Sequence, residues 1–142
     1  MIDGTQRPEY FRFASDCLGE KFEHGPSTKC VASISGDGRI LGVVVYDGIT
    51  DFNCMLHVAS DGSRRFLSRE FLRTVFWVPF VQWRLARVTG LVRATNEAAI
   101  RMDLGLGFKQ EGVIRRAFGG EDGIILGMLY EECRFLGDKH GR

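Results

Sequence analysis

The chain has 142 residues, a length typical of one domain, and its composition of 44% hydrophobic and 26% charged residues is ordinary for a globular protein. Its net charge of +1 argues against a protein that binds a polyanion over its whole surface. The charge is uneven, however, because residues 63–118 carry 11 basic and 4 acidic side chains, whereas residues 1–62 carry 5 and 9. The basic side chains are therefore concentrated in the middle of the chain.

The sequence does not indicate a membrane protein, a secreted protein or a metal-dependent protein. No apolar run approaches the roughly 18–20 residues of a membrane span, and the first residues lack a basic segment followed by an apolar one. The cysteines form no C-x-x-C pair and the histidines share no ligand spacing; these residues are Cys17, Cys30, Cys54, Cys133, His24, His57 and His140. We therefore expect a cytoplasmic protein with reduced core thiols, no metal and no membrane contact.

The first half of the chain predicts one helix and then three strands. Pro8 suits a first helical turn, and apolar residues recur at helical spacing up to Gly19, where we expect the helix to end. Asp37-Gly38 between two apolar runs is typical of a hairpin turn. The expected elements are a helix over 7–18, strands over 29–35 and 40–47 joined by a turn at 36–39, and a third strand over 52–59.

The second half predicts two helices and three strands. Ser68 is placed to cap a long helix over 68–85, and Pro79 inside that helix predicts a kink or break near Trp77 and Val78. The later elements are a strand over 87–92, a helix over 96–104 closed by Gly105 and Gly107, and strands over 108–118 and 123–131 around a turn at 119–122. The whole pattern predicts one α/β domain of mixed α+β type, in which helices flank a mixed sheet.

The loop before the long helix predicts a phosphate-binding site. A helix N-terminus presents unpaired backbone N–H groups and the positive end of the helix dipole, and both attract a phosphate or pyrophosphate. Arginines in the loop add charge-assisted donors, although arginines at a helix start are also common on a solvated surface. The candidate residues are Ser63, Arg64, Arg65, Phe66, Leu67, Ser68 and Arg69.

A second pattern begins at Asn96. Asn96-Glu97-Ala98-Ala99-Ile100 is followed by Leu106-Gly107-Phe108, then by Glu111-Gly112 and Arg115. This run resembles the carboxy-terminal half of the GNAT superfamily, the acyl-CoA-dependent N-acyltransferases. It is most similar to the branch of the ribosomal-protein N-terminal acetyltransferases, whose ending reads N-x-x-A-I…L-G-F-x-x-E-G-x-x-R. The motif covers about 96–116, and the order of helices and strands extends the resemblance to 29–131.

The resemblance implies a single GNAT-like domain over 1–142, with a shortened helical part over 1–28 and a core over 29–131. Its mostly antiparallel sheet would be flanked by helices, and the strands over 52–59 and 87–92 would splay apart to form a cleft for acetyl-CoA. The pantetheine arm of acetyl-CoA would bond to the backbone near Val58, and Asn96 would belong to the cofactor-binding residues.

The family's pyrophosphate loop, Q/R-x-x-G-x-G/A, would lie at 63–68. Ser63 and Phe66 depart from this pattern, and only the small Ser68 fits its last position. Glycine in this loop lets the backbone approach a phosphate closely, so the loop is degenerate. Arg64, Arg65 and Arg69 would then replace the missing backbone contacts with side-chain donors.

The resemblance also implies a catalytic position on the helix that follows Asn96. Family members often place a tyrosine there, which protonates the departing CoA thiolate, and the matching residue is Asp103. With an ordinary pKa of about 4, this carboxyl group would be ionised at pH 7 and could not donate a proton. Tyr130 on the last strand, Tyr46 on the second, and solvent are the alternative donors, although the sequence favours an amphipathic packing role for each tyrosine.

His57 is the candidate general base. It lies on the strand that would border the acyl group, and an ordinary histidine pKa of about 6.5 suits removal of a proton from an ammonium group. The alternative interpretation is a half-buried histidine paired with a neighbouring side chain. Strand alternation places Asn53, Met55, His57 and Ala59 on one face, and Cys54, Leu56 and Val58 on the other.

The leading functional hypothesis is an N-acetyltransferase that moves an acetyl group from acetyl-CoA to a primary amine of a protein or small molecule. The first alternative is a catalytically inactive GNAT-fold binding or structural protein, which the degenerate loop and Asp103 would suit. The second is an acyl-CoA-linked modifier of nucleic acid, which the basic middle segment would suit. A homodimer through the aromatic side of the kinked helix is a further expectation.

Overall fold

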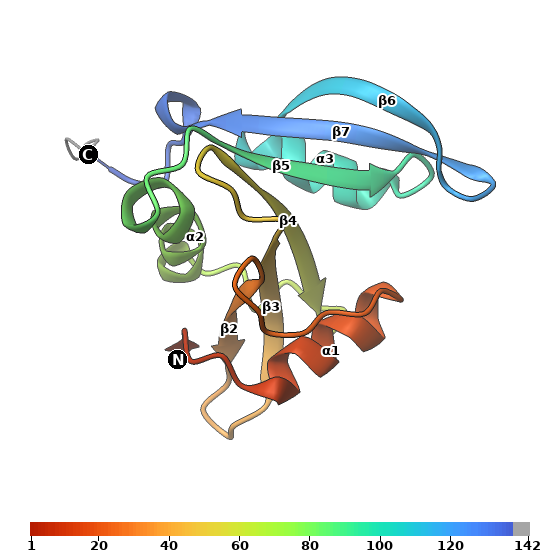
Figure 1. Cartoon of the computed structure of the whole chain (residues 1–142). Helices are drawn as coiled ribbons and strands as arrows, with labels where there is room; N and C mark the ends of the chain where they lie inside the picture. Colours follow the sequence, from red (N-terminus) through yellow and green to blue (C-terminus); the bar gives the residue numbers. More distant parts are fainter. Residues whose placement is uncertain (138–142) are drawn as a thin grey trace.

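The computed structural model describes residues 1–137, which form three α-helices and one seven-stranded sheet (Figure 1). The predicted order of helices and strands is confirmed, with one short strand, β1, in addition. The elements are β1 (Ile2–Asp3), α1 (Pro8–Leu18), β2 (Lys29–Ile34), β3 (Ile40–Asp47), β4 (Asn53–Ser60), α2 (Arg69–Trp77), β5 (Arg87–Arg93), α3 (Glu97–Leu106), β6 (Lys109–Phe118) and β7 (Glu121–Leu129).

The sheet has the strand order β1-β2-β3-β4-β5-β7-β6, and every neighbouring pair is antiparallel except β4 and β5. The predicted mixed, mostly antiparallel sheet is therefore confirmed. Helix α1 packs on one face of β2, β3 and β4, where alternate strand residues such as Ala32, Val43 and Val45 are buried against it. The opposite strand faces pack against α2 in a second core that contains Val31, Val44 and Tyr46.

The helix ends follow the local signals in the sequence. Gly19 ends α1 with a φ of 70°, and the Ser68 side chain caps α2 by accepting a 3.0 Å hydrogen bond from the Phe71 N–H. The break predicted near Trp77 is confirmed, because α2 ends there and a π-helical turn, Val78–Gln82, carries Pro79.

Two details of the prediction are wrong. Gly105 lies inside α3, and the helix ends instead at Gly107, whose φ of 111° is accessible mainly to glycine. Tyr130 is not on the last strand, because β7 ends at Leu129 and Tyr130 begins a short 3₁₀ turn, Tyr130–Glu132. In the described part of the chain, no helix is both long enough and apolar enough to span a membrane.

Candidate active site

The two central strands, β4 and β5, separate after three residue pairs. They are parallel and pair at Asn53–Arg87, Cys54–Val88 and Met55–Thr89. Beyond Met55, β4 continues beside β3 as far as Ser60, whereas β5 stays paired with β7 as far as Arg93. Figure 1 shows the two strands diverging, with α3 behind β5. The splayed pair expected from the resemblance is therefore present.

A cleft lies between the separated strands. Its outer part has a volume of about 160 Å³ and is lined by β4, β5, α3 and residues just before and after the end of α1. A smaller apolar part of about 40 Å³ continues beneath it toward α2. Both parts share the lining residues Leu56, Val58, Gly90, Met102 and Asp103. The predicted cofactor residue Val58 therefore lies at the junction of the two parts.

Gly90 leaves the middle of the cleft open. A Cβ atom added to this residue would lie 3.8 Å from Oδ2 of Asp103, with no other neighbour within 4 Å. The strand thus has no side chain at the point where the Asp103 carboxyl group faces it. A glycine inside a strand often marks a close approach of another group, and this signal was already present in the sequence Thr89-Gly90-Leu91.

Asp103 differs from its expected state. Burial in the cleft raises the pKa of Asp103 from 3.8 to about 7, because an apolar environment disfavours the charged form. The expectation of a fully ionised carboxylate at neutral pH is therefore wrong. Asp103 lies on α3, the helix that follows Asn96, as the sequence predicts. The sequence could not reveal how little water and how few polar groups surround its carboxyl group.

His57 lies on the wall of the same cleft, between two carboxylates. Its Nδ1 is 3.8 Å from Glu20 Oε2 and its Nε2 is 3.7 Å from Asp47 Oδ2, while its ring packs against Phe22 at a centroid distance of 4.9 Å. Burial lowers the pKa of His57 and outweighs the two carboxylates, which act in the opposite direction. The imidazole is therefore neutral at pH 7 and able to accept a proton.

The two tyrosines considered as proton donors, and the thiol of Cys54, lie away from the cleft. The hydroxyl group of Tyr46 is buried and donates a 2.6 Å hydrogen bond to the Val75 carbonyl oxygen. Tyr130 packs its ring against Phe80 and does not line either part of the cleft. Cys54 is fully buried, and burial raises the pKa of its thiol to about 12, which suits a core residue rather than a nucleophile.

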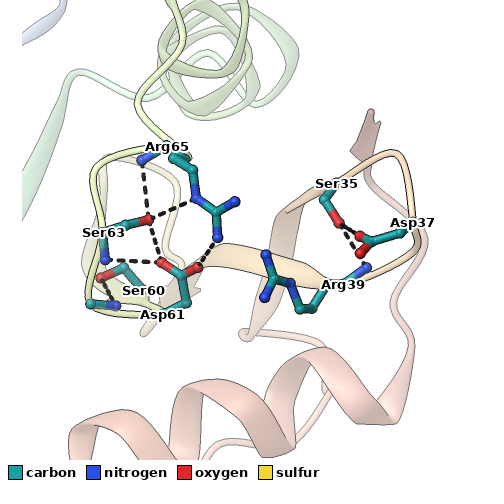
Figure 2. Close-up of polar contacts among 8 residues, drawn as sticks. Ser35, Asp37, Arg39, Ser60, Asp61, Ser63 and Arg65 are labelled. Atoms are coloured by element: carbon teal, nitrogen blue, oxygen red, sulfur yellow. Dashed lines mark hydrogen bonds and ion pairs between the residues drawn. The ribbon is translucent and has the colours of Figure 1, made fainter.

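The loop between β4 and α2 contains a carboxylate, Asp61, that bonds to donors of the same loop. The sequence did not predict these bonds. The Asp61 carboxylate accepts hydrogen bonds from the Ser63 N–H at 2.9 Å and the Ser63 hydroxyl at 2.6 Å, and it pairs with the Arg65 guanidinium at 2.9 Å (Figure 2). These donors hold the pKa of Asp61 at about 2. Two residues predicted to hold a phosphate, Ser63 and Arg65, are thus bonded to a carboxylate of their own loop.

Phe66, at a position where the resemblance predicts a glycine, anchors this loop in the core. Its side chain is 3% exposed and packs edge-on against Phe71. It also lies directly over Gly42 of β3, where an added Cβ atom would approach the Phe66 ring to 2.7 Å. The loop is therefore held by an aromatic side chain that points inward, and Phe66 and Leu67 line the inner cleft.

The remaining donors of the loop stay available for a ligand. Arg64 and Arg69 form no ion pair or hydrogen bond through their guanidinium groups within residues 1–137. They flank the start of α2, whose first-turn N–H groups lie beside the Ser68 cap. Elsewhere in the basic segment, Arg87 and Arg93 are paired with Glu111 at 2.6 Å and Glu121 at 2.8 Å. The segment's positive charge is therefore partly neutralised in the folded protein.

Asn96 has the structural role of a helix cap. Its side-chain oxygen accepts a hydrogen bond from the Ala99 N–H at 3.2 Å, and the residue also lines the outer cleft. Among residues 1–137, no group of three or more His, Cys, Asp or Glu side chains could hold a metal ion. His140, one of the histidines without ligand spacing, lies outside the described residues.

Comparison with known proteins identifies the fold. No protein-family model and no curated protein matches the sequence. A mutant of the spermidine N-acetyltransferase SpeG from Vibrio cholerae matches with a TM-score of 0.78 and 14% identity, over 96% of each chain. The spermidine/spermine N-acetyltransferase SpeG from the same organism, in complex with manganese ions, matches with a TM-score of 0.74 and 14% identity, over 92% of each chain. The chain has the GNAT fold. At this identity the likeness concerns the fold alone.

Proposed function

We propose that this protein transfers an acetyl group from acetyl-CoA to a primary amine of a protein or small molecule. The observation that carries the proposal is the separation of β4 from β5 after Met55, which leaves a cleft with Val58 and Gly90 on its walls. The β4 edge facing this cleft has no strand partner in the described chain beyond Met55. Its backbone groups are therefore suited to bond an extended amide chain such as pantetheine.

The arginines at the start of α2 support binding of the CoA phosphates. Arg64 and Arg69 would supply charge-assisted donors, and the first turn of α2 would supply backbone N–H groups and a positive dipole. Arg65 would contribute only after leaving Asp61, to which it is bonded at 2.9 Å. The residues therefore fit a phosphate group, with side chains in place of the glycine-rich backbone of the family.

His57 is proposed as the residue that accepts the proton of the acceptor amine. It is neutral at pH 7 for the reason given above, and it lines the cleft beside β4. An α-amine with a pKa near 8 is already about one-tenth neutral at pH 7, whereas a lysine amine near 10.4 is not. Catalysis would otherwise rest on holding the amine against the thioester in a defined geometry.

The binding half of the proposal is tested with the variant Gly90→Val. A Cβ atom at residue 90 would lie in the cleft with only Asp103 Oδ2 within 4 Å, so the methyl groups of valine should occupy the space for pantetheine. Acetyl-CoA should raise the melting temperature of the wild-type protein and bind measurably by isothermal titration calorimetry, and both signals should disappear in Gly90→Val. Gly112→Val is the matched control, because Gly112 lies on exposed strand β6 with nothing within 4 Å of its Cβ position.

The transfer half is tested by release of free CoA thiol in the presence of a panel of amines and amino-terminal peptides. Turnover with at least one amine supports the enzyme. Binding of acetyl-CoA without turnover on any amine would favour the inactive GNAT-fold binding protein, a candidate that the Asp61 contact in the phosphate loop also suits. Absence of any CoA binding, together with salt-dependent binding of duplex DNA, would overturn the proposal in favour of a nucleic-acid protein.

A further inference from the structure

The two halves of the sheet meet at a short junction. Strands β1, β2, β3 and β4 form one half, and strands β5, β6 and β7 form the other. Among residues 1–137, the halves are joined as strands only by the three residue pairs of β4 with β5. The cleft opens directly beyond the last pair, Met55–Thr89. The distance between its two walls therefore depends on how firmly the strands are held together at this junction.

A series of polar side chains crosses the sheet at the junction. The Thr89 hydroxyl donates a 2.7 Å hydrogen bond to Asn53 Oδ1 on β4 and accepts one of 3.0 Å from Arg87 Nε. The Arg87 guanidinium then reaches β6, where its two terminal nitrogens lie 2.6 Å and 3.4 Å from the two carboxylate oxygens of Glu111. These four side chains, which we call the junction clasp, link β4, β5 and β6.

The backbone beneath the junction clasp makes room for it. The clasp passes over Gly127 of β7, where an added Cβ atom would lie 2.5 Å from both carboxylate oxygens of Glu111 and closer still to the Arg87 guanidinium. Glu111 is the extra residue of a β-bulge, because its two neighbours on β6 pair with consecutive residues of β7. Bulges often redirect a side chain. The glycine and the bulge together allow Arg87 and Glu111 to meet across β7.

The junction clasp lies outside the cleft. Thr89 alternates along β5 with Gly90, which faces Asp103 of α3, so the Thr89 side chain points to the opposite face of the sheet. No clasp residue lines either part of the cleft. A lone ion pair on a protein surface contributes little to stability. This ion pair is joined at two points and continues through two partly buried hydrogen bonds to the other half of the sheet.

We propose that the junction clasp fixes the point at which β4 and β5 separate, and thereby holds the cleft at the width that the pantetheine arm of acetyl-CoA requires. This inference rests on the proposed acetyl transfer. A site that already has its bound geometry binds more tightly, because less conformational freedom is lost when the ligand enters. The Thr89 hydroxyl supplies this order by tying β5 to β4 at the edge of the cleft. Thr89 is therefore a positioning residue, which acts on the cofactor through the two strands.

The experiment compares wild type with Thr89→Val, which keeps the shape of the side chain and removes the hydroxyl that joins the strands. Loss of two hydrogen bonds should weaken acetyl-CoA binding roughly tenfold in isothermal titration calorimetry. The KM for acetyl-CoA should rise in parallel, whereas the KM for the amine should stay within about twofold. Thr89→Ser, which keeps the hydroxyl, should recover most of the affinity. Thr74→Val is the matched control, because the Thr74 hydroxyl donates to the Glu70 carbonyl oxygen within α2.

Hydrogen exchange without ligand tests the junction clasp independently of activity. In Thr89→Val, the amides that bond β4 to β5 should exchange roughly tenfold faster, while those that bond β2 to β3 keep their wild-type rates. Equal acceleration across the whole sheet would overturn the proposal, as would a Thr89→Val variant with wild-type exchange and affinity. Failure of the proposed function itself looks different. The wild-type protein would then bind no acetyl-CoA, but the local change in exchange would remain.

Discussion

Replacing Asp103 with asparagine should change how the stability of the protein depends on pH. In the folded state the pKa of Asp103 is raised from 3.8 to about 7 by burial. Because the folded state holds this proton more tightly than the unfolded state, ionisation of Asp103 favours unfolding. The wild-type protein should lose this part of its stability as pH rises from about 4 to about 7, and no more above that range.

The size of the effect follows from the pKa values. One pKa unit corresponds to 1.36 kcal/mol, so a rise from 3.8 to about 7 corresponds to at most about 4 kcal/mol. Asparagine carries no titrating group and lacks this dependence. The difference in unfolding free energy between Asp103→Asn and wild type should therefore grow in favour of the variant by about 2–4 kcal/mol between acidic and mildly alkaline pH.

Urea unfolding followed by tryptophan fluorescence measures this difference at a series of pH values from about 4.5 to 8.5. The contributions of Asp3 and Asp61 to the pH dependence of stability cancel in this comparison, because their pKa values of about 2 are common to both proteins. Asp51→Asn, on an exposed loop, controls for the loss of a surface carboxylate. A free-energy difference that stays constant over this range would refute the argument that an apolar cleft raises the pKa of Asp103.

Three further predictions concern the phosphate loop and the proposed base. Asp61→Asn should release the donors of the loop and raise acetyl-CoA affinity roughly two- to fivefold, as measured by calorimetry. As a control, Asp37→Asn removes the carboxylate of the hairpin turn shown in Figure 2 and should leave acetyl-CoA affinity unchanged. Gly42→Ala should destabilise the protein by about 1–3 kcal/mol in urea unfolding, because its Cβ atom would collide with Phe66, and Phe66→Leu in the same chain should recover part of the loss. His57→Gln should lower kcat/KM about 10²-fold. Since burial lowers the pKa of His57, its ionisation should add a rise in the wild-type kcat/KM with pH below about 6.5; His57→Gln should lack this rise, and a variant that keeps it would exclude His57 as the base.

Local signals in the sequence determined most of the secondary structure. Pro8, Gly19, Ser68 and Pro79 each act on the backbone within a few residues, so the helix ends and the break after Trp77 could be predicted from them. The two residues of β1 could not, since they carry no periodic pattern and form a strand only by pairing with β2. The resemblance over about 96–116 also placed Asp103 on the helix after Asn96 and predicted the GNAT fold.

The state of the candidate site was decided only by tertiary structure. Residues 63–118 carry an excess of positive charge, but folding pairs Arg87 and Arg93 with carboxylates distant in sequence. Likewise, the sequence alone predicts an ordinary pKa for Asp103. Only its burial between α2, α3 and the separated strands raises that pKa to about 7. Secondary structure depends on neighbours along the chain, whereas pKa values and ion pairs depend on desolvation and on contacts that packing alone creates.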